Sequence, residues 1–207
     1  MVDIQKRAIL LLSGGLDSGS LLFWLINRGW SILPLHIDYG QPTEPGEWRA
    51  VKSLLDVVGL EPIVRVSIPE VESLLYEVPD SSHIGNSKEE YIPSRNLLLL
   101  TLASMYARTN GVSRIMIGLI KGTSALFPDT SSEFLVSVQK TLRVEFPGMI
   151  LEAPYLNRTK FDVVSDAIAY GLLPELTFSC NLLPDRHCWQ CSSCFDRHRI
   201  FEDLGLI

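Results

Sequence analysis

Short apolar runs alternate with amphipathic stretches along most of this chain. The apolar runs predict strands over residues 8–12, 31–37, 62–68, 113–118 and 149–153. Between them, apolar residues recur at helical spacing, which predicts helices over residues 17–28, 46–58, 94–109, 131–144 and 159–171. Alternating strands and helices are joined by right-handed crossovers, and these produce a parallel sheet with helices on both faces. The pattern therefore predicts an α/β fold of the doubly wound class.

The length of the chain fits one domain over residues 1–207, with enough residues for a single large core. Within it we expect an α/β core over 1–175 and a cysteine-bearing module over 176–207. Residues 69–91 show no strong period and carry polar clusters. Since long segments of this kind in compact domains are usually functional or disordered, we interpret them as a mobile insert over the site.

Composition and charge narrow the class of protein. The hydrophobic content of 46% is that of a globular protein, and no apolar run reaches the roughly 18 residues of a membrane span. The first ten residues lack the apolar core of a signal peptide, so we expect a cytoplasmic protein that does not bind a membrane. The net charge of −6 argues against broad binding to a nucleic-acid backbone and favours a small-molecule enzyme.

The first predicted strand-to-helix junction carries two adjacent glycines. Gly14 and Gly15 allow a sharp turn and a close approach of the backbone to a ligand. The helix that follows directs unpaired N–H groups and the positive end of its dipole at this turn, which favours an anion. The sequence predicts a pyrophosphate-binding loop made of Ser13, Gly14, Gly15, Leu16, Asp17 and Ser18.

Asp17, the acidic residue of this loop, allows two interpretations. Its carboxylate can hold a Mg²⁺ ion that bridges phosphate oxygens, or it can cap the helix of an ordinary tight turn. No Gly-Lys-Ser/Thr follows, so this is not a Walker A loop, and the GxGxxG of a dinucleotide fold is also missing. The run SGGLDS directly after AILLL resembles the pyrophosphate loop of the ATP pyrophosphatases, which split ATP between its α- and β-phosphates to adenylate a substrate.

All four cysteines of the chain lie within fifteen residues, in the pattern C-x7-C-x2-C-x2-C. Four thiolates so arranged can close a tetrahedral site around one structural Zn²⁺. The alternatives are an iron–sulfur cluster, two disulfides or four free thiols. We expect His187 and His198 to lie beside the metal or at the surface. The predicted ligands are Cys180, Cys188, Cys191 and Cys194.

Polar residues also follow the other predicted strands. In doubly wound folds ligands bind at the carboxyl ends of the strands, so these residues are expected to meet in one pocket. The alternative for each set is a local role as a turn cap, a helix cap or a surface cation. The sets are Asp38, Tyr39 and Gln41 after the second strand, Arg95 and Asn96 before the long helix, and Gly118 with residues 121–129 after the fourth strand.

Successive blocks of the sequence resemble, in order, those of the 7-cyano-7-deazaguanine synthase family. They cover nearly the whole chain and read LLLSGGLDS, IDYGQ, YIPSRNLLLLTLASMYA, IGLIKGTSALFPDTSSEF, APYLNRTKFDVV, and LTFSC with CWQCSSC. The resemblance implies the adenine-nucleotide hydrolase-like fold, a structural zinc and usually a homodimer. It implies an ATP-dependent carbon–nitrogen ligase that forms AMP and pyrophosphate. This enzyme adenylates 7-carboxy-7-deazaguanine and converts it with ammonia to the amide and then to the nitrile.

The resemblance also implies roles for single residues. The loop from Ser13 to Ser18 would hold the β- and γ-phosphates of ATP with Mg²⁺, and Asp38 would assist at the nucleotide. Lys160 would stabilise charge at the α-phosphate, although a solvated lysine near a helix start is the alternative. The catalytic set is then Asp17, Lys160 and Arg95, and the substrate set is Tyr39, Gln41, Arg95, Asn96 and Asp129.

One loop departs from the family pattern. Residues 122–127 read GTSALF in place of an acidic stretch with tyrosine and serine, and Thr130 stands where cysteine is common. Asp129 survives there, either to read a purine-like ring or to cap the helix beginning near Ser131. Two other functions stay open: a diverged relative that transfers the activated acid to a protein or another amine, and a non-catalytic nucleotide-binding partner protein.

Overall fold

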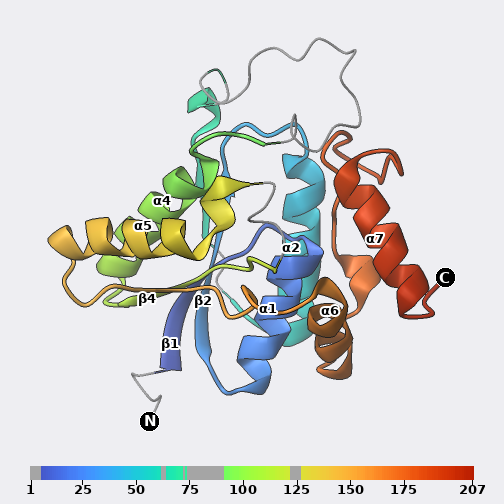
Figure 1. The fold of residues 1–207 in the computed structure, drawn as a ribbon, viewed down its shortest axis with the longest axis horizontal. Helices are drawn as coiled ribbons and strands as arrows, with labels where there is room; N and C mark the ends of the chain where they lie inside the picture. Colours follow the sequence, from blue (N-terminus) through green and yellow to red (C-terminus); the bar gives the residue numbers. More distant parts are fainter. Residues whose placement is uncertain (1–5, 62–63, 72, 74–90, 122–126) are drawn as a thin grey trace.

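The computed structural model describes residues 6–61, 64–71, 73, 91–121 and 127–207. Its centre is a sheet of five parallel strands in the order β3-β2-β1-β4-β5 (Figure 1). β1 is the middle strand, and Ile9 pairs with Leu33 on one side and with Ile115 on the other. The strands are β1 (Arg7–Leu11), β2 (Ser31–Asp38), β3 (Val64–Ser67), β4 (Arg114–Met116) and β5 (Ile150–Glu152).

The helices follow the predicted pattern to within a few residues. They are α1 (Leu16–Asn27), α2 (Glu44–Val58), α4 (Arg95–Thr109), α5 (Ser132–Glu145), α6 (Lys160–Ala169) and α7 (Ser192–Asp203). Short 3₁₀ turns are η2 (Pro69–Val71), η4 (Pro128–Thr130) and η5 (Pro174–Leu176). Among the helices of the described residues, only α7 has no counterpart in the predicted pattern, because it lies in the polar cysteine module.

Side chains of the central strand alternate between two core layers. Ala8 and Leu10 belong to a core with buried residues of α1, α2 and α6. Ile9 and Leu11 belong to a second core with buried residues of α4 and α5. Figure 1 shows these two sets of helices on opposite sides of the sheet. The predicted doubly wound α/β fold is therefore confirmed.

The topology determines where a ligand can bind. From β1 the chain proceeds to β2 on one side and later crosses to β4 on the other, so the order reverses beside β1. At such a reversal the loops after the two strands diverge and open a crevice at their carboxyl ends. The cysteine module closes this edge from one side: α7 packs against α6 through Ile200 and Val164.

Some expectations concern residues outside this description. Most of the proposed insert over 69–91 and residues 122–126 of the diverged loop lie beyond the described part of the chain. The boundary between an α/β core and a module near residue 175 stays a prediction. Among the described residues, no helix combines the length and apolar character that a membrane span requires.

Candidate functional site

The predicted pyrophosphate loop joins β1 to α1 and is built on close backbone packing. Gly14 has a φ of +82°, and a Cβ atom there would lie 2.6 Å from the carbonyl oxygen of Glu47 on α2. A Cβ atom on Gly118, just beyond β4, would lie 3.0 Å from the backbone carbonyl of Asp17. A side chain at Gly14 would push the loop away from α2, and one at Gly118 would be tightly packed against the loop.

Two serines tie this loop to itself. Ser18 Oγ lies 3.1 Å from Ser13 Oγ and donates to the carbonyl oxygen of Gly15 at 3.3 Å. The backbone N–H of Ser13 donates to Ser18 Oγ at 3.3 Å. These contacts close the turn, and α1 then begins at Leu16 with its first N–H groups at the crevice.

The carboxylate of Asp17 does not cap α1. Gly15 is the N-cap residue and no side chain caps this helix, so the capping alternative for Asp17 is wrong. Its Oδ1 atom is buried and has no hydrogen-bond partner among the described residues. Burial raises the pKa of Asp17, and the ammonium of Lys160 opposes this rise only in part. A buried carboxylate oxygen with unused acceptor capacity is a suitable ligand for a divalent cation.

Lys160 begins α6 and sits between two carboxylates. Its Nζ atom lies 2.7 Å from Asp196 Oδ2 and 3.5 Å from Asp17 Oδ1. Burial by itself would lower the pKa of Lys160, but the two carboxylates raise it. The side chain is 22% exposed, so the alternative of a solvated lysine is wrong. Lys160 is a cation held at the edge of the phosphate loop.

A cavity of about 320 Å³ opens at this edge of the sheet. It extends from the phosphate loop to the start of α4 on one side and to the cysteine module on the other. Ser179, Asn181 and Ser193 of the module contribute to its wall. The predicted site residues that it brings together are Ser13, Gly15, Leu16, Asp17, Ser18, Tyr39, Arg95, Asn96, Lys160 and Cys180. Gly14 and Asp129 are not among the described residues that line it.

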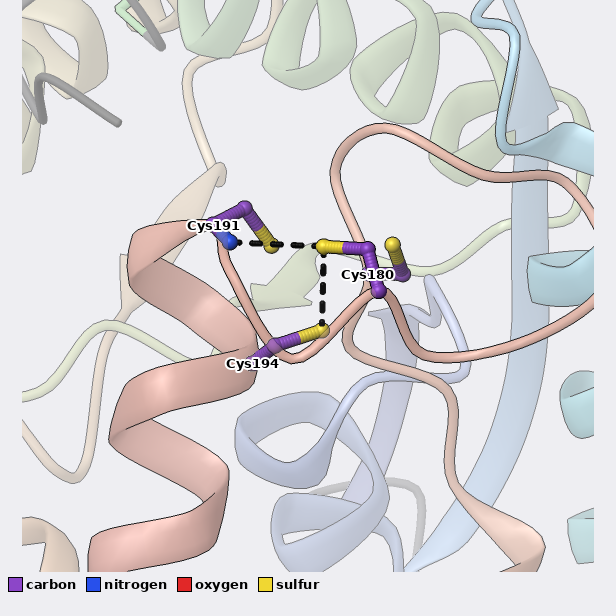
Figure 2. A group of neighbouring side chains, drawn as sticks. Cys180, Cys191 and Cys194 are labelled. Carbon is purple, nitrogen blue, oxygen red and sulfur yellow. Dashed lines mark hydrogen bonds between the residues drawn. The ribbon is translucent and has the colours of Figure 1, made fainter. Parts of the chain in front are cut away.

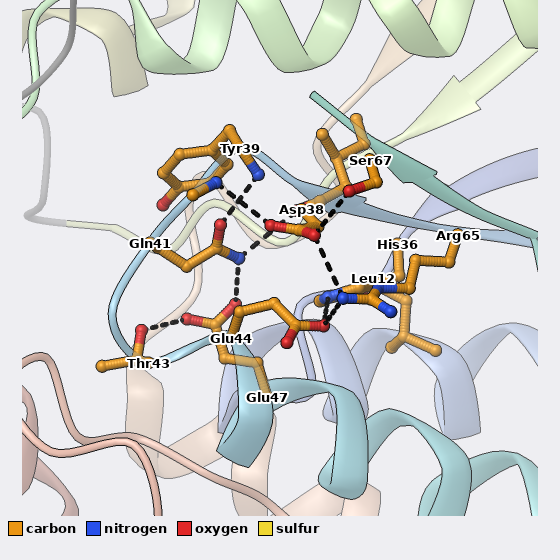
Figure 3. A network of polar contacts seen from close by, with 12 residues as sticks. Leu12, His36, Asp38, Tyr39, Gln41, Thr43, Glu44, Glu47, Arg65 and Ser67 are labelled. Atoms are coloured by element: carbon orange, nitrogen blue, oxygen red, sulfur yellow. Dashed lines mark hydrogen bonds and ion pairs between the residues drawn. The ribbon is translucent and has the colours of Figure 1, made fainter. Parts of the chain in front are cut away.

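Asp38 uses its carboxylate within the protein. Oδ1 accepts from the Gly40 N–H at 3.1 Å, and Oδ2 accepts from Ser67 Oγ at 2.7 Å and from Arg65 Nη2 at 3.0 Å (Figure 3). Burial tends to raise the pKa of Asp38, yet these donors outweigh it and hold the pKa below its usual value. The alternative that Asp38 caps a turn is confirmed by its bond to Gly40. Its predicted role at the nucleotide stays a prediction.

Gln41 is also fully engaged with the chain. Its Oε1 accepts from the Tyr39 N–H at 2.9 Å, and its Nε2 donates to the Ile37 carbonyl at 3.3 Å and to Glu47 at 3.0 Å (Figure 3). Among the described residues that line the cavity, this segment contributes Tyr39 but neither Asp38 nor Gln41. Asp38 and Gln41 therefore fix the position of Tyr39.

Asp129 belongs to η4 and lies against the start of α4. The backbone N–H of Asn96 donates to its carboxylate, and Asn96 Nδ2 donates to its carbonyl oxygen at 3.2 Å. Burial raises the pKa of Asp129, while Arg95 and the Asn96 N–H act in the opposite sense. Ser131 caps α5 by accepting from the Phe134 N–H at 3.1 Å, so the alternative that Asp129 caps that helix is wrong. The predicted recognition of a base by Asp129 stays a prediction.

The four cysteine sulfur atoms all lie within 4.8 Å of one another. Figure 2 shows the side chains of Cys180, Cys191 and Cys194 directed toward one another. All four are free thiols, which removes the alternative of two disulfides. Four sulfur ligands at about 2.3 Å from a tetrahedral metal are separated by about 3.8 Å, so small shifts would close a metal site here.

Backbone N–H groups surround these sulfur atoms. Cys180 Sγ accepts from the Leu183 N–H at 3.3 Å, and Cys188 Sγ accepts from the N–H groups of Gln190 at 3.4 Å and Cys191 at 3.3 Å. Burial opposes ionisation of Cys188, but these donors lower the pKa of its thiol to about 7. Donors aimed at sulfur favour the thiolate, which is the form that binds a metal. The cluster can therefore hold a metal ion.

The cysteine module is joined directly to the phosphate loop. The Phe178 N–H donates to the Gly14 carbonyl at 2.9 Å. Buried Arg197 of α7 donates to Thr177 Oγ1 at 2.6 Å and to the Pro174 carbonyl at 2.7 Å, which holds this segment in place. Neither Asp196 nor this connection follows from the sequence reasoning, because no local pattern signals contacts between such distant residues.

The two histidines of the module lie outside the sulfur cluster, as expected. His187 Nε2 accepts from the Ser179 N–H at 3.2 Å, and its ring packs against Phe178 and Trp189. His198 is exposed and lies 3.5 Å from Glu202.

Comparison of structures shows that other proteins share this fold. A 4-thiouridine synthetase solved in complex with RNA and bound ATP superposes with a TM-score of 0.62 at 20% identity. The match covers 98% of this chain, which spans about half, 52%, of that synthetase. The U34-tRNA thiolase NcsA from Methanococcus maripaludis, solved with its [4Fe-4S] cluster, gives a TM-score of 0.55 at 14% identity over 99% of this chain and 68% of that one. Both likenesses concern the fold alone.

Comparison of sequences is more specific. The 7-cyano-7-deazaguanine synthase 1 of Desulfitobacterium hafniense is 34% identical over 96% of this chain and 92% of its own length. The 7-cyano-7-deazaguanine synthase of Methanoculleus marisnigri is 33% identical over 98% of this chain and 96% of its own length. Residues 7–205 match the family described as queuosine biosynthesis protein QueC. The two relatives named above are enzymes. Because the family match spans nearly the whole chain, this chain belongs to the QueC family.

Proposed function

We propose that this protein is a 7-cyano-7-deazaguanine synthase, an ATP-dependent carbon–nitrogen ligase that forms AMP and pyrophosphate. The observation that supports it best is the cavity, in which the phosphate loop and Lys160 face the start of α4. The two relatives of the same name align with nearly the full length of the chain.

In the first step the carboxylate of 7-carboxy-7-deazaguanine attacks the α-phosphorus of ATP, and pyrophosphate leaves. The N–H groups at the start of α1 bind the departing phosphates, since a helix N-terminus favours anions. The Lys160 ammonium stabilises the charge that develops at the α-phosphate. Mg²⁺ fits the buried Oδ1 of Asp17 and, when bound, neutralises phosphate charge.

The substrate acid is proposed to bind on the side of the cavity formed by α4. Arg95 and Asn96 occupy the first turn of that helix, where a carboxylate is favoured by both the helix dipole and the guanidinium. Tyr39 provides an aromatic wall that can stack on a deazapurine ring. The acyl carbon then lies between the substrate pocket and the phosphate loop.

Ammonia then attacks the acyl carbon, AMP leaves, and the amide forms with loss of one proton. A second ATP activates the amide oxygen as an adenylate. Loss of AMP and two protons from the amide nitrogen gives the nitrile. The same phosphate loop serves both activations, because each consumes one ATP and releases AMP and pyrophosphate.

We further propose that the four cysteines hold one structural Zn²⁺ per chain. Four thiolates leave no open position for substrate, which assigns the metal to holding the module and not to chemistry. The homodimer that the family resemblance implies stays a prediction, and light scattering would test it.

The test is direct. Purified protein is incubated with Mg²⁺, ATP, ¹⁵N-ammonium and 7-carboxy-7-deazaguanine, and the products are identified by mass spectrometry. We expect the labelled amide first and the labelled nitrile later, together with AMP and pyrophosphate. Release of ADP and orthophosphate would contradict the proposal. Formation of an adduct with an added primary amine, but no nitrile, would favour the diverged transferase instead.

A further inference from the structure

The acidic side chain of Asp196 reaches the phosphate site from the cysteine module. Asp196 lies on α7, two residues after Cys194, and its Oδ2 is 2.7 Å from the Nζ atom of Lys160. We propose that Asp196 is a positioning residue that holds the Lys160 ammonium off Asp17, so that Asp17 stays available to a divalent cation. This inference rests on the proposed function, because the cation is the one that accompanies ATP.

Lys160 lies closer to Asp196 than to Asp17. At 2.7 Å the contact from Lys160 to Asp196 is a short, charge-assisted hydrogen bond. At 3.5 Å the contact from Lys160 to Asp17 Oδ1 exceeds the usual hydrogen-bond range. Asp17 Oδ1 is buried without a hydrogen-bond partner among the described residues. The ammonium therefore makes its short hydrogen bond to Asp196 and a longer ion pair with Asp17, whose Oδ1 accepts no hydrogen bond among the described residues.

The site holds more negative than positive charge around Lys160. One ammonium serves two carboxylates, and in a partly buried site an ion pair is stronger than in water. If Asp196 lost its charge, the carboxylate remaining nearest to Lys160 would be Asp17, and we expect that pair to close. A closed pair would use the Oδ1 atom that the cation needs and would draw the ammonium away from the phosphates.

The side chain of Asp196 is held in position by its own helix, α7. Arg199 lies one turn further along α7, and its Nη2 is 3.3 Å from Asp196 Oδ1, so both carboxylate oxygens are engaged. Cys194, in the same turn, is buried in the sulfur cluster, and Arg197 is anchored to Thr177 and Pro174. The module that binds the metal therefore fixes the position of the carboxylate that holds Lys160.

The test measures the binding of Mg²⁺ and ATP to the full-length, metal-loaded protein by titration calorimetry, without the deazaguanine acid. The variant is Asp196→Asn, and the matched control is Asp203→Asn, an exposed aspartate on the same helix. We expect Asp196→Asn to raise the Mg²⁺ concentration for half-maximal ATP binding by about 10- to 100-fold. The control should bind like the wild type, and Asp196→Glu should recover part of the loss.

A double-mutant cycle separates this role from a structural one. If Asp196 acts through Lys160, adding Asp196→Asn to Lys160→Gln should change the Mg²⁺ half-saturation no further. A merely structural role predicts additive losses and a lower melting temperature. If Asp196→Asn does not fold, Arg199→Gln, which frees the other Asp196 oxygen, should shift the Mg²⁺ dependence in the same direction by a smaller factor.

The outcomes are distinct. Wild-type-like Mg²⁺ dependence in Asp196→Asn, or additive effects in the cycle, would overturn the inference and leave the proposed function intact. A wild type that binds no ATP in the presence of Mg²⁺ would overturn both. A wild type that binds ATP, responds to Asp196→Asn as expected and yet makes no amide or nitrile would overturn only the proposed function.

Discussion

Two adjacent strands of the sheet end in segments that use their aspartates in opposite ways. After β1, Asp17 keeps a buried carboxylate oxygen without a hydrogen bond in the described structure, and its pKa is raised by burial. After β2, both oxygens of Asp38 accept hydrogen bonds from the protein, and its pKa is lowered despite partial burial. The two residues lie at the same edge of the sheet, and only Asp17 lines the cavity.

This contrast distinguishes a ligand site from its support. A polar atom that is buried and unsatisfied destabilises the free protein, so it persists where a ligand completes it. A satisfied network contributes rigidity and stability to the fold. Asp17 therefore has the features of a ligand-binding residue, and Asp38 has those of the framework that holds the site.

Loss of the zinc that we propose for the four cysteines should have the largest effect, because it acts on the support of the phosphate loop. Cys191→Ser removes a ligand, and metal binding to such sites is coupled to about 10 kcal/mol or more of folding free energy. We expect insoluble or loosened protein without zinc by elemental analysis, while the exposed control His198→Ala retains one zinc per chain. A brown protein with iron and acid-labile sulfide would show a cluster instead.

Asp17→Ala should lower ATP cleavage by about 10²- to 10³-fold with an unchanged melting temperature. Its carboxylate makes few contacts in the free protein, so removing it costs little stability. Pyrophosphate release reports the activity, and Asp203→Ala on α7 is the control. Full activity in Asp17→Ala would mean that this loop does not bind the metal of the nucleotide.

Gly14→Ala should lower the free energy of unfolding by about 3 kcal/mol, because positive φ and overpacking combine. The matched control is Gly29→Ala. Gly29 has a φ of +72° but open space around its Cβ position, and that variant should lose only about 1 kcal/mol. Urea unfolding measures both values, and equal losses would show that contact with α2 does not shape the loop.

Asp38→Asn should cost about 2 kcal/mol at neutral pH, since it weakens hydrogen bonds to a charged acceptor. Folding lowers the pKa of Asp38, so its contribution is complete above the unfolded-state pKa of about 3.9 and disappears as the pH falls through the lower folded-state value. The difference in unfolding free energy between wild type and variant should therefore shrink below about pH 4. A difference independent of pH would contradict this account.

Much of the fold could be predicted because periodicity is a local signal. The helix expected over 131–144 is α5 at Ser132–Glu145, and the strand expected over 31–37 is β2 at Ser31–Asp38. The edge where ligands bind follows from the parallel topology alone. The helix α7 could not be found in this way, because its sequence SSCFDRHRIFED is polar and buries few residues.

The candidate site was predictable only in part. The glycines and the aspartate in SGGLDS predict a tight, ligand-binding turn of the backbone, and the clustered cysteines predict a metal site. The use of each carboxylate depends on partners far along the chain: Ser67 and Arg65 for Asp38, and Lys160 and Asp196 around Asp17. No spacing rule predicts such pairs. The sequence therefore could not show that the carboxylate of Asp38 is hydrogen-bonded within the protein while that of Asp17 has an oxygen without a hydrogen bond.

The hydrogen bond from Phe178 to Gly14 has a consequence for how the protein is made. Within this sequence the phosphate loop is synthesised well before Phe178, its hydrogen-bond partner, and before Asp196, the partner of Lys160. At about 5–20 residues per second, the loop is synthesised many seconds before these contacts can form. We expect a nascent chain that has built β1, α1 and β2 to be unable to hold ATP until the cysteine module has emerged and bound its metal.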